Sequence, residues 1–287
     1  MKRPRFTWHL RTRTLELGER THLMGILNVT PDSFSDGGLY LAQDAAIGQG
    51  LKLLDDGADL LDVGGESTRP GAEPVSAEEE QARILPVLHA LLQARPAAIL
   101  SVDTYHAETA QLAVAAGAEI INDVSGLLWD PAMGAVLAEA NAGAVLMHTR
   151  GVPRQWSGLS ALEPAHVLPL VVGGLARTLE LAEAAGIDRS SIVLDPGFGF
   201  GKRGDENFVL LAQMQQLQQF NLPLLAGVSR KRFLTAHLAA PSEQDRTIAT
   251  ESAHTAAVLA GAHILRVHEV APARVSATIA DALLNHS

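Results

Sequence analysis

Short apolar runs alternate with longer helix-like segments along most of the chain. Eight of these runs are rich in Val, Ile and Leu and end on a polar or Gly-rich turn, which is typical of buried parallel strands. They begin near His22, Asp59, Ala97, Ala118, Ala142, Ser191, Pro223 and Ala262. Each interval between two runs has room for one helix. The alternation predicts βα units and a parallel sheet.

Helix-terminating residues support this interpretation at two places. The segment 77–94 follows Ser76, a favourable N-cap residue, and has three glutamates in its first turn, where the helix dipole favours acids. The segment 107–117 ends in Gly117, a residue type common just after helix C-termini. We therefore expect one helix over each segment.

Chain length and the N-terminal segment define the predicted architecture. The chain has 287 residues, close to the roughly 250 that a (β/α)₈ barrel needs. The segment RFTWHLRTRTLEL near the start alternates apolar and polar positions like strands. Composition does not change abruptly along the chain, so a domain boundary has no support. We predict an α/β protein with one domain over 1–287: an N-terminal β-hairpin at 1–20 and a (β/α)₈ TIM barrel over 21–287.

Composition and charge exclude several classes of function. A net charge of −10 argues against nucleic acid and anionic membranes as partners, because both need a basic face. The sequence has no cysteine, which excludes disulfides, thiolate metal sites and a Cys nucleophile. Neither a long apolar span nor a secretory signal is recognisable, so we expect a soluble cytoplasmic protein without a membrane partner.

Each predicted strand is followed by residues that can take part in chemistry. Because the carboxyl ends of all strands in such a barrel meet at one face, these residues are expected to converge on one pocket. They are Asn28, Asp62, the run Glu66 to Arg69, Asp103, Asn122 with Asp123, His148, Asp195, the run Ser229 to Lys231, and Arg266 with His268. Histidines and carboxylates do not cluster at metal-ligand spacing, so a zinc or iron site held by protein alone is not expected.

Two long motifs carry a family resemblance. The segments MGILNVTPDSFSDGG at 24–38 and DVGGESTRPGA at 62–72 resemble the signatures of dihydropteroate synthase, the pterin-binding barrel enzyme of folate synthesis. The resemblance continues through SVDTY, INDVSG, LMH, DPGFGFGK, GVSRK and RVHEV, in the family's order. It implies condensation of 6-hydroxymethyl-7,8-dihydropterin diphosphate with p-aminobenzoate, giving 7,8-dihydropteroate and pyrophosphate, with Mg²⁺ held by the diphosphate.

The residues fit recognition of a reduced pterin. Its guanidine-like edge presents N–H donors, which suit Asp103, Asn122 and Asp195. Lys231, just after the seventh strand, is expected to reach the pterin carbonyl, with its charge balanced by Asp195. Strand-end capping is the structural alternative for the acids. Asp123 is as well explained by structural hydrogen bonding, and His148 is nearly as well explained as a core histidine.

The diphosphate needs cations and N–H donors. Loss of diphosphate by an SN1-like path would leave a cation delocalised into the pterin ring, so the site must stabilise opposite charges at two ends. The residues expected to bind the pterin diphosphate besides the edge-binding group are Thr68, Arg69, Arg266, Val267 and His268. Arg266 and His268 alternate along a strand and so share a face. Asn28 offers a neutral oxygen to Mg²⁺.

The second substrate is assigned to the loops. The Gly-, Pro- and Ser-rich segments after the first two strands are interpreted as loops that close over the mouth and exclude water. Residues expected at the p-aminobenzoate pocket are Pro31, Ser33, Phe34, Pro70, Phe200, Ser229 and Arg230. The Gly-rich turn at 197–201 lacks the dinucleotide-binding spacing, so no nicotinamide cofactor is implied.

Two other functions share many of these residues. A methyltetrahydrofolate:corrinoid methyltransferase uses the same barrel and pterin-edge carboxylates but needs no diphosphate-binding group. A non-catalytic pterin-binding protein would retain the pocket and lose turnover. Against both, Arg69, Lys231, Arg266 and His268 favour the synthase. The resemblance also implies a homodimer formed through late helices, here the segment ATESAHTAAVLAG.

Overall fold

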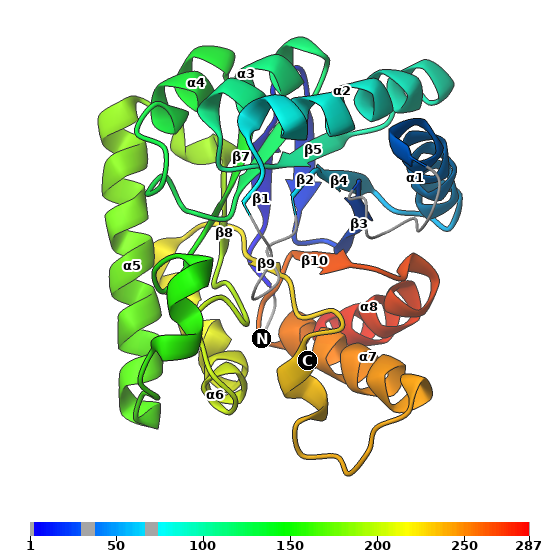
Figure 1. Ribbon diagram of the computed structural model, residues 1–287. Helices are drawn as coiled ribbons and strands as arrows, with labels where there is room; N and C mark the ends of the chain where they lie inside the picture. Colours follow the sequence, from blue (N-terminus) through cyan, green and yellow to red (C-terminus); the bar gives the residue numbers. More distant parts are fainter. Residues whose placement is uncertain (1–2, 30–37, 67–73, 287) are drawn as a thin grey trace.

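The computed structural model of the chain describes residues 3–29, 38–66 and 74–286. Two short strands precede a barrel in which strands and helices alternate (Figure 1). The strands are β1 Phe6–His9, β2 Thr14–Leu17, β3 His22–Asn28, β4 Leu60–Gly64, β5 Leu100–Asp103, β6 Ile120–Asp123, β7 Gly143–Met147, β8 Ile192–Asp195, β9 Leu225–Ala226 and β10 Ile264–Val267.

The helices lie between the barrel strands, as the alternation predicts. The α-helices are α1 Gly38–Asp55, α2 Ala77–Ala94, α3 Ala107–Ala115, α4 Met133–Ala140, α5 Pro164–Ala185, α6 Glu206–Gln213, α7 Glu243–Leu259 and α8 Val270–Asn285. Short 3₁₀ helices are η2 Pro153–Gly158, η3 Arg189–Ser191, η4 Met214–Phe220 and η5 Arg232–Thr235.

The eight strands β3 to β10 form one parallel sheet in the order β8-β7-β6-β5-β4-β3-β10-β9. The two ends of this order meet at an isolated parallel bridge between Leu194 and Leu224, where the Leu194 amide donates to the Pro223 carbonyl over 3.0 Å. The sheet therefore closes on itself. The predicted (β/α)₈ TIM barrel is confirmed.

Both helix boundaries argued from sequence agree with the structure. Ser76 caps α2 by accepting a hydrogen bond from the Glu79 amide over 3.2 Å. Beyond the end of α3, Gly117 has a φ of +108°, a backbone conformation that favours glycine. The local signals are therefore consistent with the fold that the apolar pattern predicts.

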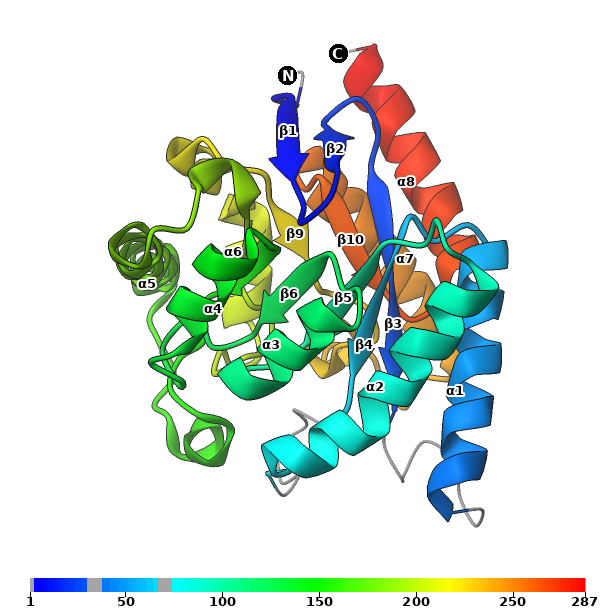
Figure 2. The same cartoon turned by 90° about the horizontal axis from the view of Figure 1, so that it is seen from above.

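The N-terminal hairpin closes the barrel end opposite the polar strand termini. β1 and β2 pair antiparallel, which confirms the predicted hairpin. Trp8 is fully buried and packs in one apolar cluster with residues from the strands, including Met24, Val145 and Leu225. Its indole N–H donates to the Ser191 carbonyl over 2.8 Å. In Figure 2 the hairpin and the C-terminal part of α8 lie at the same end of the molecule.

Helix α5 is long and apolar enough to cross a membrane by length and composition alone. Here it covers the barrel instead. Val167, Val171 and Leu175 on its inner face are fully buried in the main hydrophobic core. Packing in the core therefore explains the apolar residues on the inner face of α5.

Candidate active site at the carboxyl ends of the strands

Arg266 lies at the centre of a buried group of polar side chains. From β10 its Nε donates to Asp62 Oδ2 on β4 and its Nη2 donates to Asp103 Oδ2 on β5, both over 2.6 Å. Charge-assisted bonds of this length are strong. Because β3 lies between β10 and β4 in the sheet, one guanidinium connects strands on both sides of β3.

Asp62 has a larger role in the site than the sequence predicts. It appears only as one of many polar residues near a strand end, yet its side chain is fully buried. Besides the bond from Arg266, it accepts from Ser101 Oγ over 2.6 Å and from Asn122 Nδ2 over 2.9 Å. The carboxylate therefore orients both an arginine and an amide that the sequence assigned to substrate. Its position inside a strand gave no sign of this role.

Electrostatics in this group follow from burial and proximity. Burial raises the pKa of Asp103 above its usual range, although the Arg266 guanidinium opposes the shift. Burial works against the charged form of Arg266, but the carboxylates of Asp62 and Asp103 raise its pKa overall. The arginine thus stays cationic between the two acids.

Asn28 belongs to the same group. A Cβ placed on Gly64 would lie 3.8 Å from Asp103 Oδ2 and 3.9 Å from Asn28 Oδ1. The amide oxygen and the carboxylate are therefore close to one point above Gly64. Glycine at this position leaves that space open.

Asp195 and Lys231 face the same centre from β8 and from the segment after β9. Burial raises the pKa of Asp195, while Lys231 and Arg266 lower it by their charges. Burial lowers the pKa of Lys231 to about 8, with Arg266 acting in the same direction. The sequence expects a balanced Lys231–Asp195 pair, and the two do attract each other. The Lys231 ammonium also lies over the Phe200 ring, 4.2 Å from its centroid, in a cation–π contact.

Lys231 is the N-cap residue of the short 3₁₀ helix η5, which starts at Arg232. Ser229 is buried, and its Oγ lies 3.0 Å from His268 Nδ1. The Arg230 guanidinium turns outward to Glu243 and approaches Glu269 to 3.9 Å. Its φ of +55° is the left-handed conformation. The loop after β9 thus sends Lys231 inward and Arg230 toward the rim.

The segment 149–163, whose sequence predicts no role, packs against the site. Trp156 in η2 is buried and packs edge-on against Phe200, with ring centroids 5.3 Å apart. The Thr149 hydroxyl donates to the Gly151 carbonyl over 2.9 Å. Phe200 therefore contacts both the Trp156 ring and the Lys231 ammonium. A tryptophan between short polar runs carried no signal of this contact.

Two other polar residues at strand ends are structural. Asp123 accepts hydrogen bonds from the amides of Ser125 and Leu127 over 2.8 and 2.7 Å. His148 is buried, and burial strongly lowers its pKa. It is a neutral core histidine packed closely against Gly174, where a Cβ would lie 2.2 Å from the ring. In both cases the structural alternative explains the residue.

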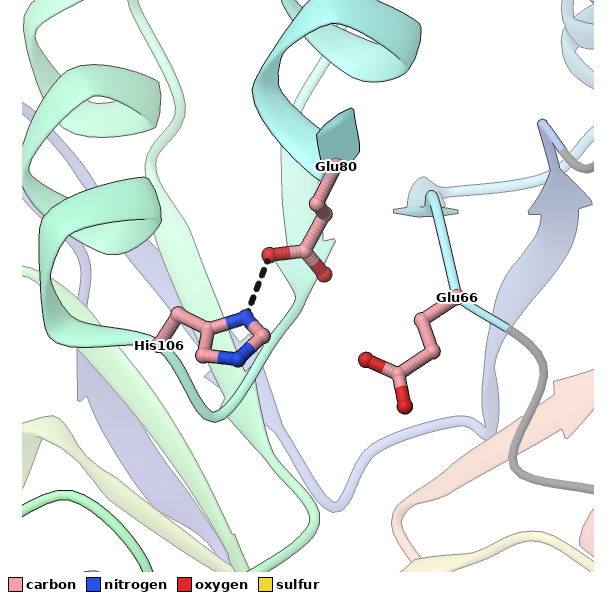
Figure 3. A group of neighbouring side chains, drawn as sticks. All are labelled: Glu66, Glu80 and His106. Atoms are coloured by element: carbon pink, nitrogen blue, oxygen red, sulfur yellow. Dashed lines mark hydrogen bonds and ion pairs between the residues drawn. The ribbon is translucent and has the colours of Figure 1, made fainter. Parts of the chain in front are cut away.

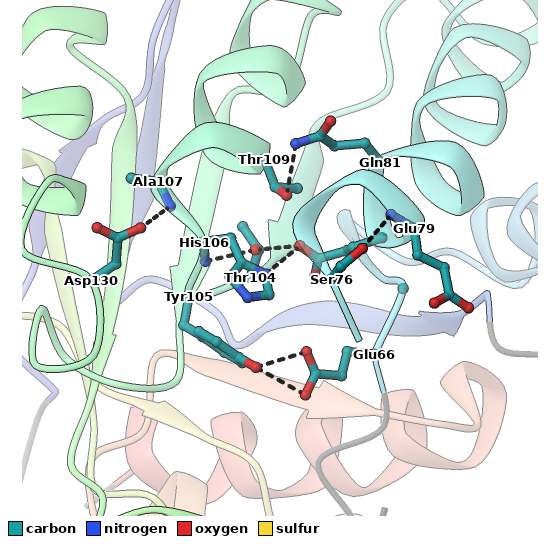
Figure 4. A network of polar contacts seen from close by, with 12 residues as sticks. Glu66, Ser76, Glu79, Gln81, Thr104, Tyr105, His106, Ala107, Thr109 and Asp130 are labelled. Carbon is teal, nitrogen blue, oxygen red and sulfur yellow. Dashed lines mark hydrogen bonds and ion pairs between the residues drawn. The ribbon is translucent and has the colours of Figure 1, made fainter. Parts of the chain in front are cut away.

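The fold also brings together three metal-ligating residues that are far apart in sequence. Glu66, Glu80 and His106 offer ligand atoms that lie within 4.8 Å of one another (Figure 3). Each already has a protein partner. Glu80 Oε2 accepts from the Thr104 hydroxyl over 2.8 Å and lies 3.1 Å from His106 Nδ1, and Tyr105 donates to Glu66 over 2.9 Å (Figure 4). The network links α2 to the loops that follow β4 and β5.

Several predicted residues lie outside the described residues. These are Pro31, Ser33 and Phe34 of the first loop and Thr68, Arg69 and Pro70 of the second. Of the other residues assigned to pterin, Asp103, Asn122, Asp195, Lys231 and Arg266 share one site. Val267 is buried in β10, and His268 follows at its end beside Ser229.

Comparisons with known proteins agree on one family. The family described as pterin binding enzyme matches residues 24–268. The dihydropteroate synthase of Bacillus subtilis is 42% identical over 277 residues, covering 96% of this chain and 93% of that protein. A structure of Xanthomonas albilineans dihydropteroate synthase with 4-aminobenzoic acid is 42% identical, with a TM-score of 0.87 over 98% of both chains. A complex of the synthase from that organism with 7,8-dihydropteroate is 40% identical, with a TM-score of 0.84 over 98% of both chains.

Proposed function

This chain belongs to the dihydropteroate synthase family of pterin binding enzymes, and from that membership we propose the reaction that it catalyses. It joins 6-hydroxymethyl-7,8-dihydropterin diphosphate to p-aminobenzoate and releases pyrophosphate, forming 7,8-dihydropteroate for folate synthesis. The observation that carries the proposal is the convergence of Asp103, Asn122, Asp195, Lys231 and Arg266 on one buried site.

The acids and the amide recognise the pterin. Asp103 and Asp195 accept from the N–H groups of the guanidine-like edge, and Asn122 completes the set with its amide oxygen as acceptor and its second N–H as donor, because one Nδ2 hydrogen is bonded to Asp62. Lys231 donates to the pterin carbonyl. Because Asn122 and Asp195 are buried and Asp103 and Lys231 are half-buried, each hydrogen bond left unmade by a wrong ligand is costly, which gives the pocket its specificity.

Bond cleavage separates charge between two ends of the substrate. The bond between the pterin methylene carbon and the diphosphate oxygen breaks, and its electron pair leaves with the diphosphate. The methylene cation is delocalised into the ring, and the buried carboxylates of Asp103 and Asp195 stabilise positive charge there. The amine nitrogen of p-aminobenzoate then forms the new bond to carbon and loses a proton. Arg266 and His268 at the end of β10, with Arg69, bind the departing diphosphate.

Asn28 suits a magnesium ion bound together with the diphosphate. Its neutral oxygen lies near Asp103 above Gly64, and Mg²⁺ usually takes few protein ligands and completes its shell with phosphate oxygens and water. When bound, Mg²⁺ neutralises charge on the leaving diphosphate. The group of Glu66, Glu80 and His106 is not needed for this role.

The p-aminobenzoate pocket is assigned to the rim. Phe200 supplies an apolar face next to Lys231, and Ser229 with Arg230 follows β9 on the same side. Ser33, Phe34 and Pro70 from the first two loops, with Thr68 at the diphosphate, complete the assignment. Closure of these loops would exclude water, which competes with the aniline for the methylene cation.

We also propose a cytoplasmic homodimer. Helices α7 and α8 pack on each other and expose several large apolar side chains, a pattern that favours association with a second copy. These exposed residues are Ile248, Leu259, Val275, Ile279 and Leu283. With a net charge of −10, neither nucleic acid nor an anionic membrane is expected as a partner.

Steady-state assays with purified chain test the reaction. We expect pyrophosphate release from the pterin diphosphate that depends on Mg²⁺ and on p-aminobenzoate, with one dihydropteroate formed per pyrophosphate. Methyl transfer from methyltetrahydrofolate to a corrinoid would identify the methyltransferase instead. Pterin binding with neither activity would identify a binding protein. Either of the last two results would contradict the proposal.

A further inference from the structure

Lys202 is a buried lysine beneath the loop that follows β8. Its side chain is at the end of the Gly-rich motif, and the residue is only 4% exposed. Nζ donates to the carbonyls of His148, Gly197 and Phe200 over 3.0, 2.8 and 3.3 Å. Three acceptors match the three N–H groups of an ammonium, because a neutral amine has only two.

One of these carbonyls, that of His148, follows β7. The other two belong to the loop that follows Asp195, the pterin-edge acid at the end of β8. The Gly197 amide donates to Asp195 Oδ1 over 2.7 Å, so the carbonyl and the amide of Gly197 connect the ammonium to the carboxylate. The Phe200 carbonyl also accepts from the Arg150 amide over 3.3 Å. By fixing Phe200, Lys202 acts on the ring that lies under the Lys231 ammonium.

The loop backbone has little room to adopt another arrangement. Gly197 has a φ of +69°, and a Cβ there would lie 2.0 Å from the His148 carbonyl oxygen. The Gly199 amide donates to Asn207 Oδ1 over 2.7 Å, and Asn207 Nδ2 donates to the Lys202 carbonyl over 3.1 Å. Lys202 is therefore held at both its backbone and its side chain, which is typical of a residue that orients others.

Electrostatic attraction is a second connection between Lys202 and Asp195. Burial raises the pKa of Asp195, and the hydrogen bond from the Gly197 amide and the positive charges of Lys231, Lys202 and Arg266 offset part of this shift. The charged groups that act on Lys202 itself are Asp195 and Glu206, which favour its ammonium, and Lys231 and Arg150, which oppose it. Burial lowers the pKa of Lys202 to about 7, so below neutral pH the side chain carries its full positive charge.

We infer that Lys202 is a positioning residue for the proposed reaction. It holds the Gly197–Phe200 turn in the geometry that orients Asp195 and Phe200, and through Gly197 it places a positive charge near the Asp195 carboxylate. The inference rests on the proposed function, because it concerns binding of the same pterin. It assigns no contact between Lys202 and substrate.

The pH dependence of kcat/KM for the pterin diphosphate tests this role. In Lys202→Met the positive charge is lost, so we expect kcat/KM to fall at least about tenfold and its acidic limb to move up by about one pH unit. Lys202→Gln, which keeps two N–H donors but no charge, is expected to show the same shift and serves where the Met variant fails to fold. Lys202→Arg keeps the charge and should leave the limb near its original position.

The controls separate this inference from the proposed function. The unmodified chain must turn over in the same assay, which tests the reaction itself. Lys52→Met removes an exposed lysine of α1 whose partner is Asp56, and its pH profile should match that of the unmodified chain. If the neutral Lys202 variants fold and lose rate with no movement of the acidic limb, Lys202 only stabilises the fold and the inference is wrong.

Discussion

The Nη2 of Arg266 donates to Asp103 Oδ2 over 2.6 Å, although 163 residues separate the two in the chain. This bond joins β10 to β5 across the mouth of the barrel. It keeps a cation and an acid side by side before any substrate arrives. A pterin that needs carboxylates and a diphosphate that needs cations would meet both groups at one place.

Asp103→Asn tests the acid of this pair. The amide keeps the size of the side chain but cannot accept two N–H bonds as an anion, so pterin binding should weaken. A lost charge-assisted contact at a buried site costs about 2 to 5 kcal/mol, so kcat/KM for the pterin should fall by roughly a hundredfold. Steady-state kinetics check this. A variant with unmodified kinetics would show that Asp103 does not bind the pterin edge.

Asp62→Asn tests the carboxylate that orients Arg266 and Asn122. Because it removes one charge from a buried pair, we expect a loss of roughly 3 kcal/mol in the free energy of unfolding, together with a higher KM for the pterin. Asp123→Asn is the matched control, since Asp123 is equally buried but forms its hydrogen bonds with Ser125 and Leu127 of its own turn. It should lower stability and leave KM within about threefold. Equal changes in KM in the two variants would show that Asp62 has no particular role in pterin binding.

Gly197→Ala tests the turn after β8. A Cβ at this position would lie 2.0 Å from a backbone oxygen, whereas a Cβ at Gly186, which also has a positive φ, meets no heavy atom within 4 Å. Gly186→Ala should cost only about 1 kcal/mol of stability, from its backbone angle. Gly197→Ala should cost at least about 2 kcal/mol more and also raise KM for the pterin. Urea unfolding measures the free energy of unfolding of each variant, and steady-state kinetics measure KM for the pterin. Equal losses of stability in the two variants would show that the turn tolerates the side chain at Gly197.

The buried His263, near the hairpin end of the barrel, should make the stability of the protein depend on pH. Its Nδ1 accepts from the Leu224 amide over 3.1 Å and its Nε2 faces the Pro4 carbonyl at 3.0 Å, so the folded ring is neutral. Burial lowers its pKa from 6.5 to about 4. The unfolded chain therefore binds more protons between these values, and stability falls as the pH drops from 6.5 to 4.

His263→Asn removes this titration. Between neutral pH and about pH 4.5, we expect the free energy of unfolding of the variant to fall by roughly 2 kcal/mol less than that of the unmodified chain. His22, whose pKa burial also lowers to about 4, still titrates, so part of the decrease remains. Urea unfolding at both pH values measures the difference. Parallel decreases in both proteins would rule out His263 as a source of the pH dependence.

Much of the fold could be predicted from the sequence because its signals are local and repeated. Eight apolar runs, helix caps such as Ser76, and glycines beyond helix ends all report on neighbouring residues. Parallel strands joined by helices then have few ways to close. The convergence of Asp103, Asn122 and Asp195 followed from the same argument, because strand ends of a barrel share one face.

Other parts of the site depend on contacts between distant segments, which a single sequence does not show. Asp62 looks like any acid near a strand end until Arg266, Ser101 and Asn122 are found around it. Lys202 stands in a polar segment typical of solvent-exposed lysines, yet its ammonium is buried. Arg230, expected near p-aminobenzoate, forms ion pairs with Glu243 and Glu269 that sequence spacing does not predict.

A crystal structure of the chain with the pterin diphosphate and Mg²⁺ tests the central claim most directly. We predict that the amino edge of the pterin lies against Asp103, Asn122 and Asp195, that Lys231 bonds to its carbonyl, and that the diphosphate lies toward Arg266, His268 and Asn28. A pterin bound elsewhere on the molecule, with these side chains keeping only the contacts they make to one another, would contradict the account.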